Sequence, residues 1–303
     1  MEQLPAALGD EIEDPEEEAF LVFSQPIPSQ NLGFVDPKAE ILELNVAGRD
    51  FSIRQSPGVL TSNREGGTTG AVVWKVTPAF SAWLCSPNNI LFRTGLIDAE
   101  STAVELGCGI SGLVALSLAP KIRKYLATDQ TYVLKLLDQN IRENSQHRPS
   151  AATPGKKQNS KRGDARQTAS SHGKRRTEKD AATTIETVAL DWQTDSVLSL
   201  QPYLPSAAVN VVIACDCIYN ESLIPPFVST CADVCRSFSP LPEKPTLCIV
   251  AQQLRSPDVF EAWLKEFWKY FRVRRLPDEE LDEGLKEGSG FVVHIGMLRS
   301  TAK

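Results

Sequence analysis

A glycine-containing turn is the first feature of this sequence that could do chemistry. Residues 104–112 read Val-Glu-Leu-Gly-Cys-Gly-Ile-Ser-Gly and join an apolar run to an amphipathic stretch. Glycines let the backbone turn tightly and approach a ligand, and the N-terminus of a following helix offers free N–H groups. Gly107 and Gly109 therefore predict a nucleotide-binding turn. A G-x-G turn taken alone serves NAD equally well, so it leaves the cofactor open.

Two acidic residues near this turn narrow the choice of cofactor. Asp129 ends the next apolar run, 22 residues after Gly107, where a carboxylate can accept hydrogen bonds from both hydroxyls of a ribose. This position fits either cofactor. Glu105 directly precedes the turn, and its charge would repel a pyrophosphate but suits a cationic ligand. S-adenosylmethionine carries a sulfonium and an ammonium and no phosphate, so it is the favoured cofactor.

Two more groups of residues follow apolar runs. Asp191 and Trp192 could flank an adenine, with the indole packed on the ring; the simpler alternative is a Trp in the core. Asp216 and Tyr219 follow the run that ends at Cys215, which would place them beside a transferred methyl group. The alternative for this pair is a helix N-cap and a packed Tyr.

The elements that must position these residues follow from the hydrophobic pattern. Short apolar runs alternate with helical stretches and cover residues 103–106, 125–128, 187–190, 209–214 and 247–251. This alternation predicts an α/β fold, Rossmann-like, with a mostly parallel sheet whose strand ends meet at one edge. Residues 272–276 and 290–298 predict a closing antiparallel hairpin, and residues 72–84 predict an amphipathic helix.

The chain divides into an arm, a hairpin and one large domain. Residues 1–36 are rich in acidic residues and prolines and predict a flexible arm. Residues 37–64 predict an N-terminal β-hairpin, and residues 65–303 form the main domain, interrupted by an insert at 146–182. The insert has no hydrophobic residue except alanine and carries ten Lys or Arg against three Asp or Glu, a net charge of +7. We expect it to be disordered, and the other residues to carry −13 of the net charge of −6.

Composition excludes several classes of protein. No run approaches the roughly 18 to 20 apolar residues of a membrane span, and the acidic N-terminus is unlike a secretory signal. The sequence thus predicts a cytoplasmic protein without a membrane partner, with the nucleus as the alternative address. Seven scattered cysteines without C-x-x-C pairs favour reduced, core-filling thiols over a metal site.

At these residues the sequence resembles the seven-strand protein-lysine methyltransferases, the group that contains the methyltransferase-like 21 enzymes. The shared motifs are the E-L-G-x-G turn, the L-D-W strand end, the D-x-x-Y tetrad at Asp216 and a G-x-x-x-W segment ending at Trp74. The N-terminal hairpin and residues 290–296 resemble the fungal ribosomal lysine methyltransferase 5 family. This resemblance implies a seven-stranded sheet, S-adenosylmethionine as cofactor, and a monomer acting on a lysine of a large-subunit ribosomal protein of the L1 type.

The resemblance also implies roles for single residues. The expected catalytic residues are Asp216, which would orient the amine, and Tyr219, an apolar wall. The expected cofactor-binding residues are Trp74, Glu105, Gly107, Gly109, Asp129, Asp191, Trp192 and Cys215. Ile110 departs from the pattern, because the group commonly has Thr or Ser there.

Two other functions stay open at this point. The basic insert is compatible with a nucleic-acid methyltransferase or with a weak RNA contact, although such an arm supplies no base readout. A non-catalytic module that keeps the fold, or binds a dinucleotide, is the second alternative. The acidic residues at 105, 129 and 216 argue against it, because a site with its functional side chains present argues for use.

Overall fold

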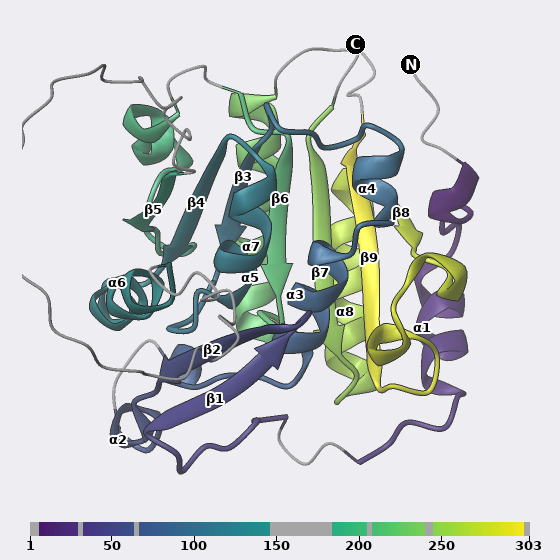
Figure 1. Cartoon of the computed structure of the whole chain (residues 1–303). Coiled ribbons are helices and arrows are strands. Elements are labelled where there is room, and N and C mark those ends of the chain that lie inside the picture. The colour runs from purple at the N-terminus through teal and green to yellow at the C-terminus, as the bar shows by residue number, and fades with distance from the viewer. Residues whose placement is uncertain are drawn as a thin grey trace, which may run out of the picture.

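A seven-stranded sheet is the central element of the computed structural model, which describes residues 6–29, 33–63, 67–145, 184–204, 208–239 and 245–299 (Figure 1). Its strands are β3 (Thr102–Leu106), β4 (Lys124–Asp129), β5 (Thr184–Ala189), β6 (Val211–Cys215), β7 (Leu247–Gln253), β8 (Phe271–Arg275) and β9 (Phe291–Leu298). The strand order is β5-β4-β3-β6-β7-β9-β8. All pairs are parallel except those of β9, which is antiparallel to β7 and β8. The predicted fold class is confirmed.

The order of these strands fixes where a ligand can bind. The chain runs from β3 outward to β4 and β5, returns to β6 beside β3, and then continues to β7. The direction of winding therefore reverses between β3 and β6, whose last paired residues are Leu106 and Ala214. In open α/β sheets the binding crevice lies outside the carboxyl ends of the strands at this reversal.

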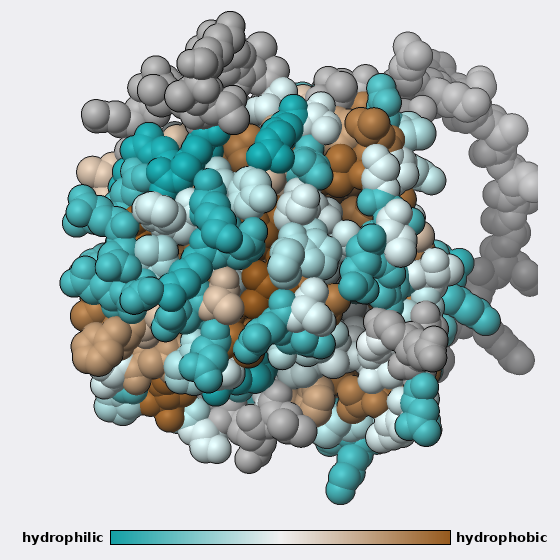
Figure 2. Space-filling view, turned by 180° about the vertical axis from the view of Figure 1, so that it is seen from behind, coloured by the Kyte–Doolittle hydropathy of each residue, from teal (hydrophilic) through white to brown (hydrophobic). Residues whose placement is uncertain are grey.

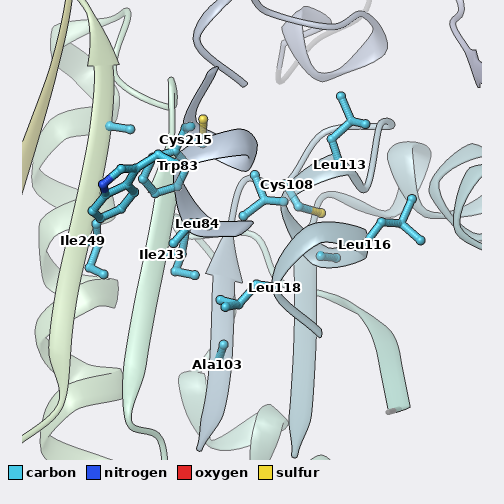
Figure 3. Packing of buried hydrophobic residues seen from close by; sticks show 14 of the residues in the cluster. Trp83, Leu84, Ala103, Cys108, Leu113, Leu116, Leu118, Ile213, Cys215 and Ile249 are labelled. Carbon is cyan, nitrogen blue, oxygen red and sulfur yellow. The ribbon is translucent and has the colours of Figure 1, made fainter. Parts of the chain in front are cut away.

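Helices cover both faces of the sheet. One face carries α3 (Val76–Cys85), α4 (Ile90–Arg93), α5 (Leu113–Leu118) and α6 (Thr131–Ser145), and the other carries α1 (Pro15–Phe23), α7 (Ile224–Phe238) and α8 (Pro257–Tyr270). Alternate strand residues serve the two cores: Ile213 and Cys215 face the first, as Figure 3 shows, while Val212 and Ala214 face the second. Seen from behind, the molecule is largely covered by hydrophilic side chains, with hydrophobic residues showing between them (Figure 2). Buried strands with apolar residues on both faces are typical of such a sheet.

The remaining elements are short. The only other α-helix of the described residues is α2 (Pro57–Leu60). The 3₁₀ segments are η1 (Ala6–Leu8), η2 (Thr69–Ala71), η3 (Ala119–Lys121), η4 (Val197–Tyr203), η5 (Glu221–Leu223), η6 (Asp278–Glu280) and η7 (Glu283–Leu285). Within the described residues no helix is both long enough and apolar enough to span a bilayer.

The predicted N-terminal hairpin is present and lies across the carboxyl end of the sheet (Figure 1). It consists of β1 (Ile41–Val46) and β2 (Arg49–Arg54). Two asparagines of α6 bind its second strand as a neighbouring strand would: Asn144 bonds both backbone groups of Ser52, and Asn140 bonds those of Arg54. Asn140 also donates to the carbonyl of Ile110 at 2.7 Å, so the hairpin is linked to the glycine turn.

The N-terminal arm differs from the prediction. Residues 6–29 include α1, which has Asp14 as its N-cap and packs on α8. The rings of Phe23 and Phe260 lie 5.5 Å apart, and the indole of Trp268 donates to the carbonyl of Ile12. The apolar residues at 19 and 22 bury one face of α1, which outweighs the acidic composition that favoured a loose segment.

Two further differences concern boundaries. The helix predicted for residues 72–84 begins only at Val76. Residues 72–74 are instead held in an extended form, because the N–H of Val35 donates to the carbonyl of Val73 and Phe34 forms a β-bridge with Trp74. The predicted basic insert at 146–182 lies outside the described residues.

Candidate active site

One pocket opens at the carboxyl ends of β3, β4, β5 and β6, where the winding of the sheet reverses. It encloses about 900 Å³ including its open mouth. The structure brings all ten sequence-predicted site residues to its wall: Trp74, Glu105, Gly107, Gly109, Asp129, Asp191, Trp192, Cys215, Asp216 and Tyr219. Their placement together agrees with the motif analysis, while their individual roles stay predictions.

The glycine turn forms the floor between β3 and α5. Gly107 and Gly109 have φ angles of +67° and +61°, a region that side chains with a Cβ rarely adopt. A Cβ at Gly107 would lie 2.8 Å from the sulfur of Cys217 and 2.9 Å from the ring of Trp192. Glycine is therefore required here both for the turn and for the close packing of the pocket wall.

Glu105 lies beneath this turn and is only 2% exposed. Its carboxyl group accepts a hydrogen bond of 2.7 Å from the hydroxyl of Tyr125 on the neighbouring strand β4. Burial raises the pKa of Glu105 to about 8, although this hydrogen bond acts in the opposite direction. The carboxyl group is thus largely protonated near pH 7, and a cation in the pocket would favour its ionised form.

Asp129 and Asp191 line the same side of the pocket. Asp129 ends β4, and its two oxygens accept the backbone N–H groups of Gly109 at 2.8 Å and of Gln130 at 2.7 Å. Burial nevertheless raises the pKa of Asp129 to about 6. The amide of Gln130 donates to Asp191 at 3.0 Å, so one side chain connects the ends of β4 and β5. Sequence reasoning did not single out Gln130, although its position directly after Asp129 was visible.

Trp192 closes the wall next to the glycine turn. Its ring lies 5.1 Å from that of Phe227 on α7, which fixes one face of the indole. Its ring nitrogen is buried and has no hydrogen-bond partner among the described residues. Both alternatives for this residue therefore hold in part, because the Trp packs against the core and also lines the pocket.

Asp216 follows β6, and its carboxylate already has partners within the protein. Its carboxylate pairs with both terminal nitrogens of Arg255 and accepts the N–H of Gln253, and its side chain is 1% exposed. A direct contact with a substrate amine would require this pair to break. Asp216 has a φ of +58°, which Asp tolerates better than most residues. Sequence reasoning missed Arg255, although its position just after an apolar run was a usable signal.

Trp74 and Tyr219 stand at the mouth. The indole of Trp74 donates to the carbonyl of Thr69 at 3.1 Å, and the centre of its ring lies 4.5 Å from that of Phe34 and 4.7 Å from the guanidinium of Arg255. Arg255 thus joins Trp74 to Asp216 through one cation–π contact and one ion pair. Tyr219 is 38% exposed and carries no such anchor among the described contacts.

The thiol of Cys215 is buried in the wall, 3.7 Å from the hydroxyl of Thr77. Burial raises the pKa of Cys215 well above its usual range, so the residue is a neutral thiol. Among the described residues no group of His, Cys, Asp and Glu is arranged to hold a metal ion.

The lining distinguishes the two cofactors that the sequence left open. Glu105, Asp129 and Asp191 line the pocket, and none of its described lining residues is Lys, Arg or His. A pyrophosphate would meet acidic groups without a compensating cation, whereas a sulfonium and an ammonium would be stabilised there. The residues therefore fit S-adenosylmethionine, with the turn at Gly107 as the close approach.

Comparisons with known proteins agree with this fit. No protein-family model matches the chain. It is similar to ribosomal lysine N-methyltransferase 5 of Zygosaccharomyces rouxii, 32% identical over 71% of this chain and 70% of that protein, and to the enzyme of the same name from Saccharomyces cerevisiae, 30% identical over 77% and 74%. It is also 24% identical to a Schizosaccharomyces pombe diaminohydroxyphosphoribosylamino-pyrimidine deaminase over 93% of this chain, which spans 58% of that protein.

Similar solved structures include a putative methyltransferase in complex with S-adenosylhomocysteine. It has a TM-score of 0.43 and 11% identity, and it covers 85% of this chain and 56% of that one. Two of the similar yeast sequences reach 30% identity or more over more than two thirds of their length. They confirm the predicted methyltransferase class and its donor, S-adenosylmethionine, and the chain belongs to the ribosomal lysine N-methyltransferase 5 family.

Proposed function

We propose that this protein methylates a lysine side chain of a ribosomal protein, with a large-subunit protein of the L1 type as the expected target. The observation that carries the proposal is the pocket at the strand reversal, whose described lining contains acidic side chains and no basic one. The names of the yeast relatives supply the substrate class. A ribosomal substrate is compatible with the cytoplasmic address expected from the sequence.

The substrate amine must be neutral to attack. An ordinary lysine has a pKa near 10.4, so presenting it neutral at pH 7 costs about 5 kcal/mol unless the site lowers that pKa. The exposed Tyr219 and the anchored Trp74 supply apolar walls at the mouth, and removal of water from the amine between them lowers its pKa. The bound donor supplies an activated methyl group, so positioning provides much of the catalysis.

Asp216 acts in this scheme by shaping the mouth. Its ion pair fixes Arg255 under Trp74, and its backbone ends β6 at the pocket wall. No histidine lines the pocket among the described residues, so the proton of the amine leaves to water.

The deaminase name does not lead to a second function for this chain. Zinc-dependent deaminases use an H-x-E segment and a P-C-x-x-C segment, and the 303-residue sequence contains neither pattern. A nucleic-acid methyltransferase is the alternative that the basic insert keeps open, and the next experiment separates it from the proposal.

The test uses salt-washed large ribosomal subunits and S-adenosylmethionine with a labelled methyl group. We expect label on one protein band, resistant to ribonuclease, lost on proteolysis and recovered as methyl-lysine. The Gly107→Arg variant, which blocks the pocket floor, is the matched control without label. Label that remains in RNA after proteolysis would replace the proposal with RNA methylation.

A further inference from the structure

A second, smaller cleft opens next to the mouth of the pocket. It encloses about 330 Å³ including its open side and lies between the loop after β6, the end of β7 and the first turn of α8. Its walls include Ile218, Tyr219, Gln252, Arg255, Val259 and Phe260. Tyr219 lines both this cleft and the main pocket, so the cleft is next to the place where a side chain would enter past Tyr219.

Gln252 gives the cleft an unused hydrogen-bond donor. The residue is 3% exposed, and its side-chain nitrogen is buried without a partner among the described residues. It follows Cys248 and Val250 on the face of β7 that packs against α7 and α8, where an apolar residue would be expected. A buried donor left unpaired is costly, so an acceptor brought by another molecule would stabilise this amide.

Charge and size define that acceptor. Arg255 also lines the cleft, but its charge is balanced by Asp216 and its second terminal nitrogen also binds Gln253. The cleft is therefore close to neutral, which favours a carbonyl over a carboxylate. The cleft encloses about 330 Å³ against about 900 Å³ for the main pocket, so it suits a short piece of main chain rather than a second cofactor.

We infer that this cleft is a substrate subsite in which Gln252 donates a hydrogen bond to a main-chain carbonyl of the protein substrate, next to the target lysine. The inference rests on the proposed function. It makes Gln252 a positioning residue that affects how the substrate protein binds and leaves the donor pocket unchanged.

The test is Gln252→Met, which keeps the length of the side chain and removes the hydrogen-bond donor. With a recombinant L1-type ribosomal protein as substrate, we expect KM to rise about three- to tenfold, the effect of losing one hydrogen bond, with kcat within twofold of wild type. The Kd for S-adenosylmethionine should not change, and the Tm should not fall, because the amide nitrogen makes no hydrogen bond within the part of the chain that the structure describes. Gln201→Met, at an exposed position of η4, is the matched control with unchanged KM.

A second variant keeps the inference testable if Gln252→Met folds poorly. Val259→Phe fills the cleft from α8 and should raise KM in the same way. An unchanged KM in either folded variant would assign the cleft to bound water and overturn the inference. Absence of methyl transfer by the wild-type enzyme would instead reject the proposed substrate, and the inference with it.

Discussion

The two sides of the pocket treat their carboxyl groups in different ways. At the ends of β3 and β4, Glu105 is buried and Asp129 is half-buried, both accept hydrogen bonds from neutral donors, and burial raises the pKa of both. At the end of β6, Asp216 is buried and is paired with Arg255. Among the described residues, the carboxyl groups of the first side therefore have no cation of their own, whereas the charge of Asp216 on the second side is already balanced.

This difference matches what each side must bind. A cationic methyl donor is stabilised by carboxylates that have no cation of their own. A substrate amine must be neutral when it attacks, so a free carboxylate at the mouth would stabilise its unreactive, charged form. The ion pair between Asp216 and Arg255 removes that competing attraction and anchors Trp74 as well.

The largest effect is expected from a substitution in the glycine turn, on the side of the pocket that would bind the methyl donor. Gly107→Arg places a Cβ against Cys217 and Trp192 on a backbone with φ of +67°, so we expect at least a thousandfold loss of affinity for S-adenosylmethionine, about 4 kcal/mol. Isothermal titration calorimetry measures this. Gly95→Arg is the matched control, because Gly95 has φ of +70° but open space around it. Native affinity in Gly107→Arg would show that the donor binds elsewhere.

The sequence predicted one side of the pocket better than the other. The placement of Glu105, Gly107 and Asp129 around one pocket was predicted, because each lies within a strand or at its end, where local pattern fixes position. The ion pair between Asp216 and Arg255 was not predicted. Arg255 is 39 residues from Asp216 and reaches it only because β6 pairs with β7.

The N-terminal segment shows the same limit. Phe34 is 40 residues from Trp74, and no short-range signal connects the two rings. The arm was predicted to be loose because its acidic composition was visible while its partner, α8, lies more than 230 residues later. Contacts between residues so far apart in the sequence form only once the sheet has assembled, so composition and hydrophobic periodicity do not predict them.

The ion pair at the end of β6 is tested by a double-mutant cycle. Arg255→Met leaves the 1%-exposed carboxylate of Asp216 uncompensated and should lower the free energy of unfolding by about 3 kcal/mol or more. Asp216→Asn should cost less, because the side chain of Arg255 is 21% exposed. The double variant should be no less stable than Arg255→Met, since it removes both charges. Urea denaturation measures all three.

The same variants separate structure from chemistry. We expect Asp216→Asn to bind S-adenosylmethionine within threefold of wild type and to transfer methyl groups about a hundredfold more slowly, a loss of about 3 kcal/mol. Equal losses of donor binding and transfer would make Asp216 a cofactor or folding residue. Additive losses of stability in the cycle would show that Asp216 and Arg255 do not act as a pair.

The smallest expected effect concerns the proton on Glu105. Because the pKa of Glu105 is about 8 without a ligand, and a bound cation lowers it, binding of the donor releases a proton below pH 8. Affinity for S-adenosylmethionine should therefore rise with pH between 6.5 and 8, by at most about tenfold per pH unit. The Glu105→Gln variant should lose this rise, because it cannot ionise. Calorimetry at both pH values measures the difference, and a wild-type affinity that is independent of pH would contradict it.

The pH dependence of the free energy of unfolding tests the raised pKa of Glu105 independently. The folded protein keeps a proton on Glu105 that the unfolded chain releases above its ordinary pKa of 4.5. The folded state thus binds more protons between pH 4.5 and 8, and the free energy of unfolding must fall as pH rises through that range. In Glu105→Gln this contribution disappears, while the hydrogen bond from Tyr125 can still be accepted by the amide oxygen. Saturating donor should weaken the fall in the wild type, because a carboxylate beside a bound cation no longer has a raised pKa.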